Sequence, residues 1–436
     1  MTDPAALDTH EHSDLPALIR LGDSPAPTTA SELSDFDIEE QLILDCALKL
    51  ASTVPHFNTE WAGQQLGLPL QIMDEICWKL KEDQLLEVLG QLGPFRYRYN
   101  ATGRGREVAA RLLEISGYVG RLPVALASYN SMIVWQSERL PKISLPNVEA
   151  ALADLVLPDQ AVEVAALAAA SDRSLFLFGP AGNGKTSIGR ALNDVAYGEF
   201  WIPHSIAIDA HIIRVYDPQH HEVVDVPEED RSQVDQRWVR VRRPFVVAGG
   251  EMTLDEVELN WSSSLRFYEA PLQVKANGGV FFIDDLGRQH VPPEDLLNRW
   301  IVPLENQVDY LTLLTGQKIQ VPFNLMLIIA TNLSVGDVAD PAFLRRMGYR
   351  LHVYPPDETA FRRIFTKYAA KEGTQVSESI LELVLDRYRT EGRELRASEP
   401  RDLIERAKDI CKLHDQPFQL TEDIMNTAWL GYFGNM

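Results

Sequence analysis

The apolar positions of this chain change their spacing along its length, and the spacing predicts helices and strands in turn. In the first part of the chain they recur at helical spacing in several segments, which is typical of helices with one buried face. Two further segments alternate between apolar and polar residues around a Gly-Pro turn, a pattern that favours two antiparallel strands. We therefore predict a small domain at 36–116, with helices at 38–51, 58–66, 69–82 and 102–113 and strands at 85–89 and 95–99.

The middle of the chain holds short, continuous apolar runs instead, and these predict buried strands. The run at 174–178 leads into a glycine-rich loop and a helix, the run at 278–285 ends in two aspartates, and the run at 325–330 is followed by Thr-Asn. Strands that deliver polar side chains at their carboxyl ends suit a doubly wound sheet. We predict an α/β core at 146–356, with helical residues at 146–170 and 293–307 and a β-hairpin at 310–321.

The segments around these two domains are assigned by composition. Residues 1–35 are rich in Asp, Pro, Ser and Thr and poor in large apolar residues, which predicts a disordered acidic arm. Residues 117–145 mix Gly, Pro and apolar residues and are interpreted as a linker with a short helix at 124–134. Four helical segments at 357–436 predict a separate lid-like domain.

A long stretch at 216–276 separates a strand-like run at 206–209 from the aspartate-ending strand. A stretch of this length between core strands favours an insertion with a function of its own. His220 and His221 lie in it without spaced partner ligands, so we interpret them as surface histidines.

Composition limits the classes of function. The chain has 41 basic and 63 acidic residues in 436, a net charge of −22, so phosphate repels it and general coating of nucleic acid is disfavoured. Its three cysteines, Cys46, Cys77 and Cys411, are scattered without metal-ligand spacing, which favours buried thiols in a reducing compartment. We find no signal peptide and no apolar run of about 18 residues. The expectation is a soluble, cytoplasmic protein with no membrane partner.

The loop after the strand at 174–178 reads GPAGNGKT and fits G-x-x-x-x-G-K-[ST] at each fixed position. Its glycines let backbone N–H groups turn toward phosphate oxygens, and the following helix adds the positive end of its dipole. Lys185 is expected to reach the β- and γ-phosphates, and the Thr186 hydroxyl to hold Mg²⁺. The sequence predicts a site for ATP and Mg²⁺ formed by Gly179, Pro180, Ala181, Gly182, Asn183, Gly184, Lys185, Thr186 and Ser187.

Polar residues at the ends of the other two strands extend this site. Asp284 is expected to complete the Mg²⁺ shell, and Asp285 to orient or deprotonate the attacking water. Asn332 follows the strand at 325–330, at the edge where the γ-phosphate and the water would lie. The predicted chemistry is hydrolysis of ATP to ADP and phosphate.

Taken in order, these parts resemble an AAA+ ATPase over about residues 146–436. The segments that match are GPAGNGKT, VFFIDD, LIIATN, DPAFLRRM and the start of a lid helix at Glu399-Pro400-Arg401. The resemblance implies that Asn332 is the sensor 1 residue and that Arg401 contacts the nucleotide bound to its own subunit. It implies that Arg346 or Arg345 reaches the γ-phosphate of a neighbouring subunit, and hence a homo-oligomeric ring, usually of six. The implied fold is a three-layer P-loop core with a parallel sheet, followed by a C-terminal helical lid.

Two details refine the resemblance. The hairpin at 310–321, with the insertion ahead of VFFIDD, resembles the branch that contains magnesium-chelatase and MoxR-type proteins. That family usually has Glu where Asp285 stands, and the shorter side chain would leave the water further from the base. The run Asp-Asp-Leu-Gly at 284–287 is similar to that of some helicase-loader and transposition-helper ATPases. We expect hydrolysis, and a slow rate stays open.

The domain at 36–116 resembles a winged helix, most clearly in the wing-to-helix step from Tyr99 to Ala109. Its recognition-type helix at 69–82 carries three acidic residues against two lysines, while the arginines gather on the wing and the closing helix. This balance favours docking to a protein over readout of bases.

The leading interpretation is an oligomeric AAA+ ATPase that remodels a protein partner recruited through residues 36–116. The alternatives are a DNA-associated ATPase of the helicase-loader or transposition-helper type, and a scaffold that binds nucleotide and turns it over slowly. The aromatic residues of the insertion either line a central pore or pack the insertion's own core; they are Trp238, Trp261, Phe267 and Tyr268.

Overall fold

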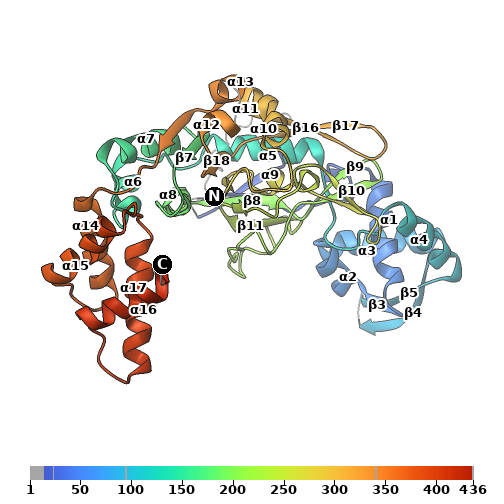
Figure 1. The fold of residues 1–436 in the computed structure, drawn as a ribbon. Helices are drawn as coiled ribbons and strands as arrows, with labels where there is room; N and C mark the ends of the chain where they lie inside the picture. The colour runs from blue at the N-terminus through green and yellow to red at the C-terminus, as the bar shows by residue number, and fades with distance from the viewer. Residues whose placement is uncertain (1–13, 23, 94–95, 339–340, 435–436) are drawn as a thin grey trace.

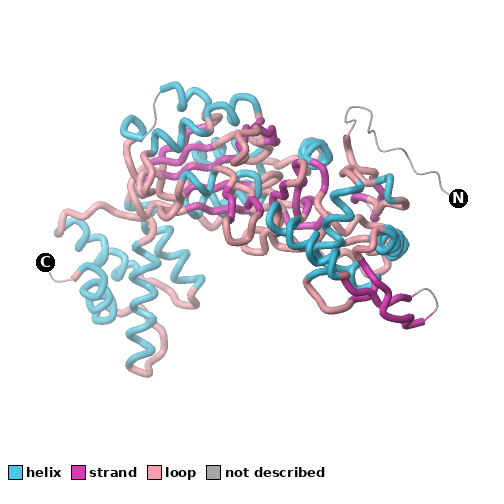
Figure 2. Tube along the Cα trace, turned by 90° about the vertical axis from the view of Figure 1, so that its right-hand side faces the viewer, coloured by secondary structure: helices cyan, strands magenta, loops and turns pink. Residues whose placement is uncertain are grey.

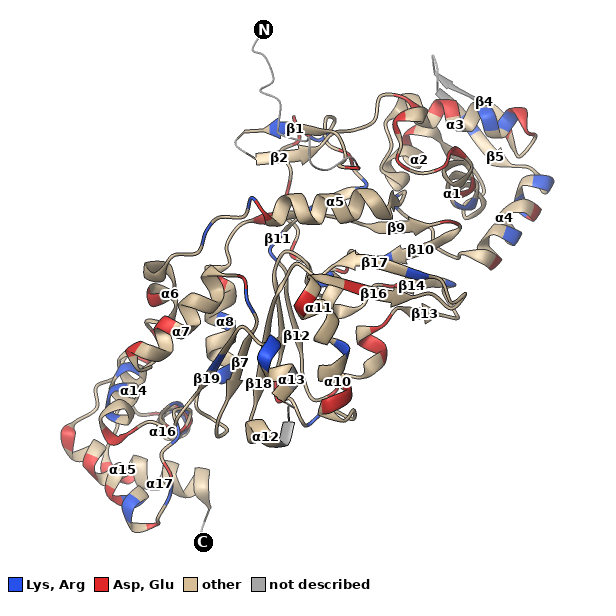
Figure 3. Cartoon of the chain, turned by 90° about the horizontal axis from the view of Figure 1, so that it is seen from above, with Lys and Arg blue, Asp and Glu red and all other residues tan. Residues whose placement is uncertain are grey.

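The computed structural model describes residues 14–22, 24–93, 96–338 and 341–434, which form an elongated molecule (Figure 1). A helical domain near the N-terminus lies at one end and an all-helical C-terminal domain at the other, as two views agree (Figures 1 and 3). An α/β core and a second, mostly β body lie between them. No helix in these described ranges is long and apolar enough to cross a membrane.

The α/β core is built on a five-stranded parallel sheet in the order β12-β15-β18-β7-β19. The glycine-rich loop follows β7, and the two aspartates follow β15. Because the strands are parallel, both segments lie at the carboxyl edge of the sheet. The predicted α/β class with a parallel sheet is confirmed. The strands are β7 (Leu175–Phe178), β12 (Phe245–Ala248), β15 (Val280–Ile283), β18 (Met326–Thr331) and β19 (Tyr349–His352).

Helices cover both faces of this sheet and make three layers. Alternate residues of one strand separate the two faces: Leu175 and Leu177 face one cluster of buried residues, and Phe176 faces the other. The first face is covered by α6 (Leu145–Leu152), α7 (Asp159–Ala170) and α8 (Lys185–Val195). The second is covered by α9 (Leu272–Lys275), α10 (Pro293–Arg299), α11 (Ile301–Asn306) and α13 (Pro341–Arg346); the short α12 (Val335–Val338) follows β18.

The structure corrects the boundaries of the insertion predicted at 216–276. Strand β12 lies inside that range, yet it is an edge strand of the core sheet and pairs in parallel with β15 from Phe245 to Ala248. Conversely, the run at 206–209, which we took for a core strand, belongs to another sheet. Short apolar runs of similar length do not reveal which sheet they join, because the pairing partners are distant in sequence.

The second body packs a five-stranded mixed sheet, in the order β13-β14-β10-β9-β6, and two antiparallel strand pairs around one buried cluster. The strands of the sheet are β6 (Val124–Ala125), β9 (Ser205–Ile208), β10 (His211–Arg214), β13 (Asn260–Ser262) and β14 (Phe267–Glu269). The pairs join β8 (Glu199–Pro203) to β11 (Trp238–Arg242), and β16 (Val308–Thr312) to β17 (Lys318–Pro322) as a hairpin. The 3₁₀ turn η2 (Leu254–Val257) lies between β12 and β13.

The prediction of a linker at 117–145 is wrong. This segment contributes β6 to the mixed sheet and then forms α5 (Leu126–Ser137), which crosses the second body in Figure 3. Tyr129, Met132 and Trp135 of that helix are buried in the cluster. Burial of these large side chains fixes the segment, whatever its glycine and proline content suggests.

The N-terminal domain contains the elements predicted for 36–116. The helices are α1 (Glu40–Ser52), α2 (Thr59–Leu66), α3 (Leu70–Glu82) and α4 (Gly103–Ile115), and the strands are β3 (Phe57–Asn58), β4 (Leu86–Gly93) and β5 (Arg96–Ala101). Strands β4 and β5 form a hairpin that projects from the domain in Figure 2, and β3 adds a third strand beside β5. The turn at 94–95 lies outside the described residues.

The prediction that 1–35 is a disordered arm is wrong for the described part of that segment, whereas residues 1–13 lie outside the described residues. Strands β1 (Leu18–Leu21) and β2 (Ser24–Pro27) pair as a hairpin, and η1 (Leu33–Asp35) follows. The hairpin is held from outside: the Asp235 amide donates to the Pro27 carbonyl, and the Thr29 amide to the Gln233 carbonyl. Backbone pairing with a distant segment orders a sequence whose composition alone favours disorder.

The C-terminal domain is the four-helix unit predicted from residue 357 onward. Figure 2 shows it as helices and loops only. Its helices pack around their own cluster of buried residues, which includes Phe361, Leu403 and Trp429. They are α14 (Glu358–Lys371), α15 (Glu378–Thr390), α16 (Glu399–Leu413) and α17 (Glu422–Phe433).

Candidate functional site

The glycine-rich loop connects β7 to α8 in a conformation that needs its glycines. Gly179, Gly182 and Gly184 have φ values of +138°, +80° and +92°, in the region that L side chains rarely adopt. A Cβ atom at Gly179 would also lie 2.3 Å from the Val353 carbonyl oxygen. The loop is therefore a backbone cradle of the kind that binds phosphate, at the N-terminus of an 11-residue helix.

Lys185 begins that helix and points back into the loop. Its side-chain ammonium donates to the carbonyls of Gly179 and Pro180, at 2.8 and 3.0 Å, and to Asn332 Oδ1 at 2.5 Å. The residue is only 5% exposed. Burial lowers the pKa of Lys185, and the carboxylates of Asp285 and Asp284 act against that shift. A phosphate would give this ammonium a stronger partner than neutral carbonyls do.

Thr186 and Asp284 face each other across the sheet edge. The Thr186 hydroxyl donates to Asp284 Oδ2 at 2.7 Å. A hydroxyl and a carboxylate are the hard oxygen ligands that Mg²⁺ accepts beside waters and phosphate oxygens. The donor set therefore fits Mg²⁺, and the described residues contain no cluster of three or more His, Cys, Asp or Glu that could hold a metal by itself.

A polar chain joins the three strand ends. Asn332 accepts from Lys185 through Oδ1 and donates through Nδ2 to Asp285 Oδ1. The two heteroatoms of one amide thus connect the Lys185 ammonium to the Asp285 carboxylate. Asp285 itself has φ +52°, so its backbone turns sharply away from β15 and leaves its side chain beside Asn332.

These groups line one cavity of about 970 Å³. The cavity wall contains all of the residues predicted to bind or hydrolyse nucleotide except Gly179, Pro180, Arg345 and Arg346. The predicted residues in the wall are Ala181, Gly182, Asn183, Gly184, Lys185, Thr186, Ser187, Asp284, Asp285, Asn332 and Arg401. Gly179 and Pro180 lie behind the wall and contact Lys185 through their carbonyls.

The C-terminal helical domain closes one side of the cavity by direct contact with the loop. The Ser398 amide donates to the Gly182 carbonyl at 2.8 Å, and the Ala397 amide to Asn183 Oδ1 at 3.2 Å. Arg401, one turn into α16, lines the cavity with a side chain that is 55% exposed and paired with Asp402 at 3.0 Å. Its predicted place beside the nucleotide site thus agrees with the geometry of the described chain.

Arg345 and Arg346 do not line the cavity. Both lie at the end of α13, where Arg345 is exposed and Arg346 pairs with Glu305 at 3.1 Å. Asp340, the first residue of the segment matched to DPAFLRRM, lies outside the described residues. Within one chain these two side chains are therefore not part of the cavity wall.

Sequence reasoning missed part of the cavity wall. The loop between α6 and α7 and the face of α14 supply an apolar and basic side opposite the carboxylates. Spacing alone did not reveal them, because neither segment carries a motif and each reaches the cavity only through packing of separate domains. The missed residues are Asp154, Leu155, Val156, Leu157, Arg288, Ile364, Lys367, Tyr368, Lys371, Ala397 and Ser398.

The histidines and aromatic residues of the 216–276 stretch are mostly interior. The prediction of a surface position is wrong for His221, which is 4% exposed and contacts the Asp217 amide and the Lys275 carbonyl. Burial lowers the pKa of His221 to about 4. Trp238 and Tyr268 are buried in the cluster of the second body, with Trp261 half-buried beside Tyr268. Phe267 is buried in the cluster of the N-terminal domain, where its ring contacts Tyr118.

Comparison with known proteins adds one family match and several distant structural likenesses. Residues 357–430 match a family described as Domain of unknown function (DUF8689). No curated protein matches the chain. The match coincides with the C-terminal helical domain and gives it no activity.

The solved structures that resemble the chain do so at low identity. NtrX from Brucella abortus, in complexes with ADP and with ATP, aligns at 15% and 14% identity with a TM-score of 0.40, over 68% of this chain and 57% of that chain. RuvB from Thermotoga maritima, titled a Holliday junction branch migration motor, aligns at 15% identity with a TM-score of 0.35, over 66% of this chain and 69% of that chain. The present chain thus spans little more than half of the NtrX chain. Such scores establish no shared activity or partner.

Proposed function

We propose that this chain is an AAA+ ATPase that binds ATP with Mg²⁺, hydrolyses it, and uses the cycle to remodel a protein partner. The observation that carries the proposal is the polar chain Lys185–Asn332–Asp285 at the carboxyl edge of the parallel sheet, beside Thr186 and Asp284. In this proposal the loop that binds the phosphates, the ligands of Mg²⁺ and the carboxylate that orients the attacking water all line the same cavity. The purine has an apolar place between the 155–157 loop and α14 in the same cavity.

Each residue has a chemical role in this proposal. Lys185 exchanges its carbonyl partners for the β- and γ-phosphates. Thr186 and Asp284 would hold Mg²⁺ with its waters, and the metal would supply positive charge beside the phosphates. Asp285 accepts a hydrogen bond from the attacking water, and Asn332 holds that carboxylate in place.

Calorimetry with ATP tests the nucleotide site. Lys185→Ala should abolish measurable ATP binding, because the phosphates lose their buried cation. Arg350→Ala removes an exposed cation from β19 and serves as the control. Equal ATP affinity of wild type and Lys185→Ala would overturn the assignment.

We further propose that the ATPase works as a ring, in which Arg346 or Arg345 reaches the γ-phosphate of the next subunit. Arg346→Ala should then bind ATP normally and hydrolyse it at least 10²-fold more slowly, since trans guanidinium groups are worth about 10³–10⁵ in related NTPases. Mixing Arg346→Ala with Lys185→Ala should recover activity, because one variant keeps the pocket and the other keeps the finger. Full activity of a wild-type monomer, by light scattering and ATPase assay together, would refute the trans role.

For the partner we propose a protein that docks on the N-terminal domain, which has the element order of a winged helix. Large apolar side chains lie exposed on this domain: Leu70 and Trp78 on α3, Leu89 on β4 and Tyr97 on β5. Exposed aromatic and leucine side chains are typical of protein interfaces. Pull-down with Asp285→Asn, which should hold ATP without turning it over, identifies the partner, and Trp78→Ala in the same background should weaken its capture. ATPase stimulation by duplex DNA, unchanged by Trp78→Ala, would favour the DNA-associated class instead.

A further inference from the structure

Arg288 is a cavity residue to which neither the motif nor the family resemblance assigns a role. It comes three residues after Asp285 and lines the same cavity, together with Lys185 and Asn332. Its side chain is exposed, and it makes no hydrogen bond or ion pair with any of the described residues. Arg401 and Arg346, in contrast, are each paired with a carboxylate.

The turn that carries Arg288 is held in one conformation. Gly287 has φ +100°, a conformation that L side chains rarely adopt, and a Cβ atom there would lie 2.4 Å from Leu333 Cδ1. The Leu286 amide donates to the Ala330 carbonyl, which ties the turn to β18. The Arg288 amide donates back to the Asp285 carbonyl at 3.1 Å. The backbone of Arg288 is therefore placed relative to the water-handling carboxylate.

Gln289 locks the same turn from its other side. Its side-chain amide donates to the carbonyls of Gly249 and Asp284, and its oxygen accepts from the Gly287 amide. These bonds connect the turn to the end of β12 and to the end of β15. A guanidinium presented by so constrained a backbone loses less conformational entropy on binding an anion than one on a loose loop.

We propose that Arg288 contacts the γ-phosphate of the ATP bound to its own subunit and stabilises the charge that develops there during hydrolysis. The inference rests on the proposed ATPase function. In that reaction the water oxygen bonds to the γ-phosphorus while the bond from that phosphorus to the β,γ-bridging oxygen breaks. The electron pair of the broken bond stays with ADP, and the proton of the water passes to Asp285 and then to solvent. A guanidinium offers two parallel donors to phosphoryl oxygens, which suits it to the charge that develops on the transferring group.

The test combines steady-state kinetics with mixing. Arg288→Ala should keep ATP affinity within about threefold and lower kcat by about 10²–10³-fold, with Arg350→Ala as the matched surface control. Arg288→Lys should recover only part of the rate, because an ammonium lacks the paired donors. Binding of ADP with aluminium fluoride, which mimics the transferring phosphoryl group, should weaken in Arg288→Ala, while binding of ADP alone should not change.

Mixing separates a role in the same subunit from a role in the neighbour. Arg288→Ala mixed with Lys185→Ala should show no recovery at any ratio, because every pocket then lacks either its own arginine or its lysine. The pair of Arg346→Ala and Lys185→Ala serves as the positive control for recovery. Recovery with Arg288→Ala, or a wild-type kcat, would overturn the inference and leave the ATPase proposal intact. Loss of the Lys185 effect on ATP binding would instead overturn the ATPase proposal. If thermal unfolding shows that Arg288→Ala does not fold, the same measurements on Arg288→Lys test the inference instead.

Discussion

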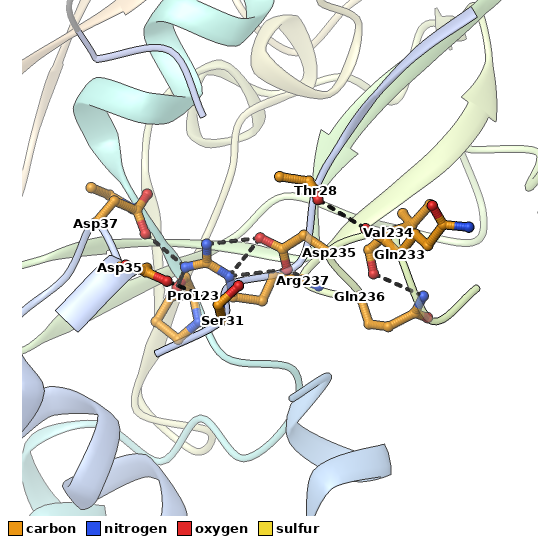
Figure 4. A network of polar contacts seen from close by, with 11 residues as sticks. Thr28, Ser31, Asp35, Asp37, Pro123, Gln233, Val234, Asp235, Gln236 and Arg237 are labelled. Atoms are coloured by element: carbon orange, nitrogen blue, oxygen red, sulfur yellow. Dashed lines mark hydrogen bonds and ion pairs between the residues drawn. The ribbon is translucent and has the colours of Figure 1, made fainter. Parts of the chain in front are cut away.

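The buried charge cluster around Arg237 offers the sharpest test of how the N-terminal segment is attached to the body of the molecule. Arg237 lies between two carboxylates that come from distant parts of the chain (Figure 4). Its guanidinium donates to Asp37 at 2.7 Å, to Asp235 at 2.8–3.1 Å and to the Pro123 carbonyl at 3.3 Å. It also stacks over Phe36 at 4.7 Å. The perturbation is Arg237→Met, which keeps much of the side-chain volume and removes the charge.

The expected loss follows from burial. The side chains of Arg237 and Asp235 are each 6% exposed and that of Asp37 is 23% exposed. Removing one partner of a buried ion pair leaves an uncompensated charge and costs about 3–5 kcal/mol. Arg242→Met is the matched control at the other end of β11, since Arg242 and Glu222 are 68% and 70% exposed and such pairs contribute about 0–1 kcal/mol.

Hydrogen exchange measures this loss locally, which suits a molecule of several domains that need not unfold together. The reporting amides are those of Thr29 and Asp235, which bond the N-terminal segment to the 233–235 stretch. A change of 3–5 kcal/mol corresponds to roughly 10²–10⁴-fold faster exchange in Arg237→Met, against less than about tenfold in Arg242→Met. Adding Asp235→Asn should slow exchange again, because the deepest unpaired charge is then removed.

Acid provides an independent check on the same cluster. Burial acts to raise the pKa of Asp37, but the Arg237 guanidinium and hydrogen bonds from Ser128 and Ala125 hold it below its ordinary value of 3.8. A depressed carboxylate pKa stabilises the native state above the unfolded-state pKa, and this contribution disappears as the pH falls through the folded-state pKa.

Exchange in Arg237→Met equal to that of wild type at pH 7 would refute the reasoning, because the cluster would then contribute nothing to attachment.

Three further predictions concern separate parts of the chain. Gly182→Ala should weaken ATP binding about tenfold in calorimetry, because a φ of +80° costs a residue with a side chain about 1–2 kcal/mol. The new Cβ atom would also lie 2.8 Å from Ser398 Oγ. Unchanged affinity would mean that the loop rearranges freely. His221→Gln should make the free energy of unfolding less dependent on pH between 6.5 and 4. The pKa of His221 is lowered from 6.5 to about 4, so the unfolded state takes up the proton first, and the native state loses up to about 3 kcal/mol of stability as the pH falls. Denaturant titrations at several pH values would contradict this if wild type and variant lost stability equally. Residues of the N-terminal domain should show only weak, salt-sensitive binding to duplex DNA that depends on Arg98, whereas tight binding that persists at high salt in a fluorescence titration would contradict the protein-docking proposal.

Local sequence determined those features whose physical cause is local. The glycine loop could be identified because the positive-φ residues, the lysine and the threonine are contiguous, so the motif and the cradle are the same eight residues. The strand that ends in Asp284 and the helices of the C-terminal domain follow from the spacing of apolar residues that are near neighbours in the chain. The predicted position of Asn332 also followed from a strand end, and the structure brings it to Lys185.

Tertiary structure decided everything that depends on which distant segments meet. Strand β12 and the run at 206–209 are equally apolar and short, and only pairing with β15 makes the first a core strand. Helix α5 and the N-terminal hairpin have compositions typical of a linker and of a disordered arm, yet burial and bonds to residues far along the chain order both. Arg288 and Arg346 look equally available in the sequence, but the turn after β15 places the first in the cavity while α13 places the second beside Glu305. Side-chain environment is a property of long-range contacts, and a local pattern of apolar and polar positions does not contain them.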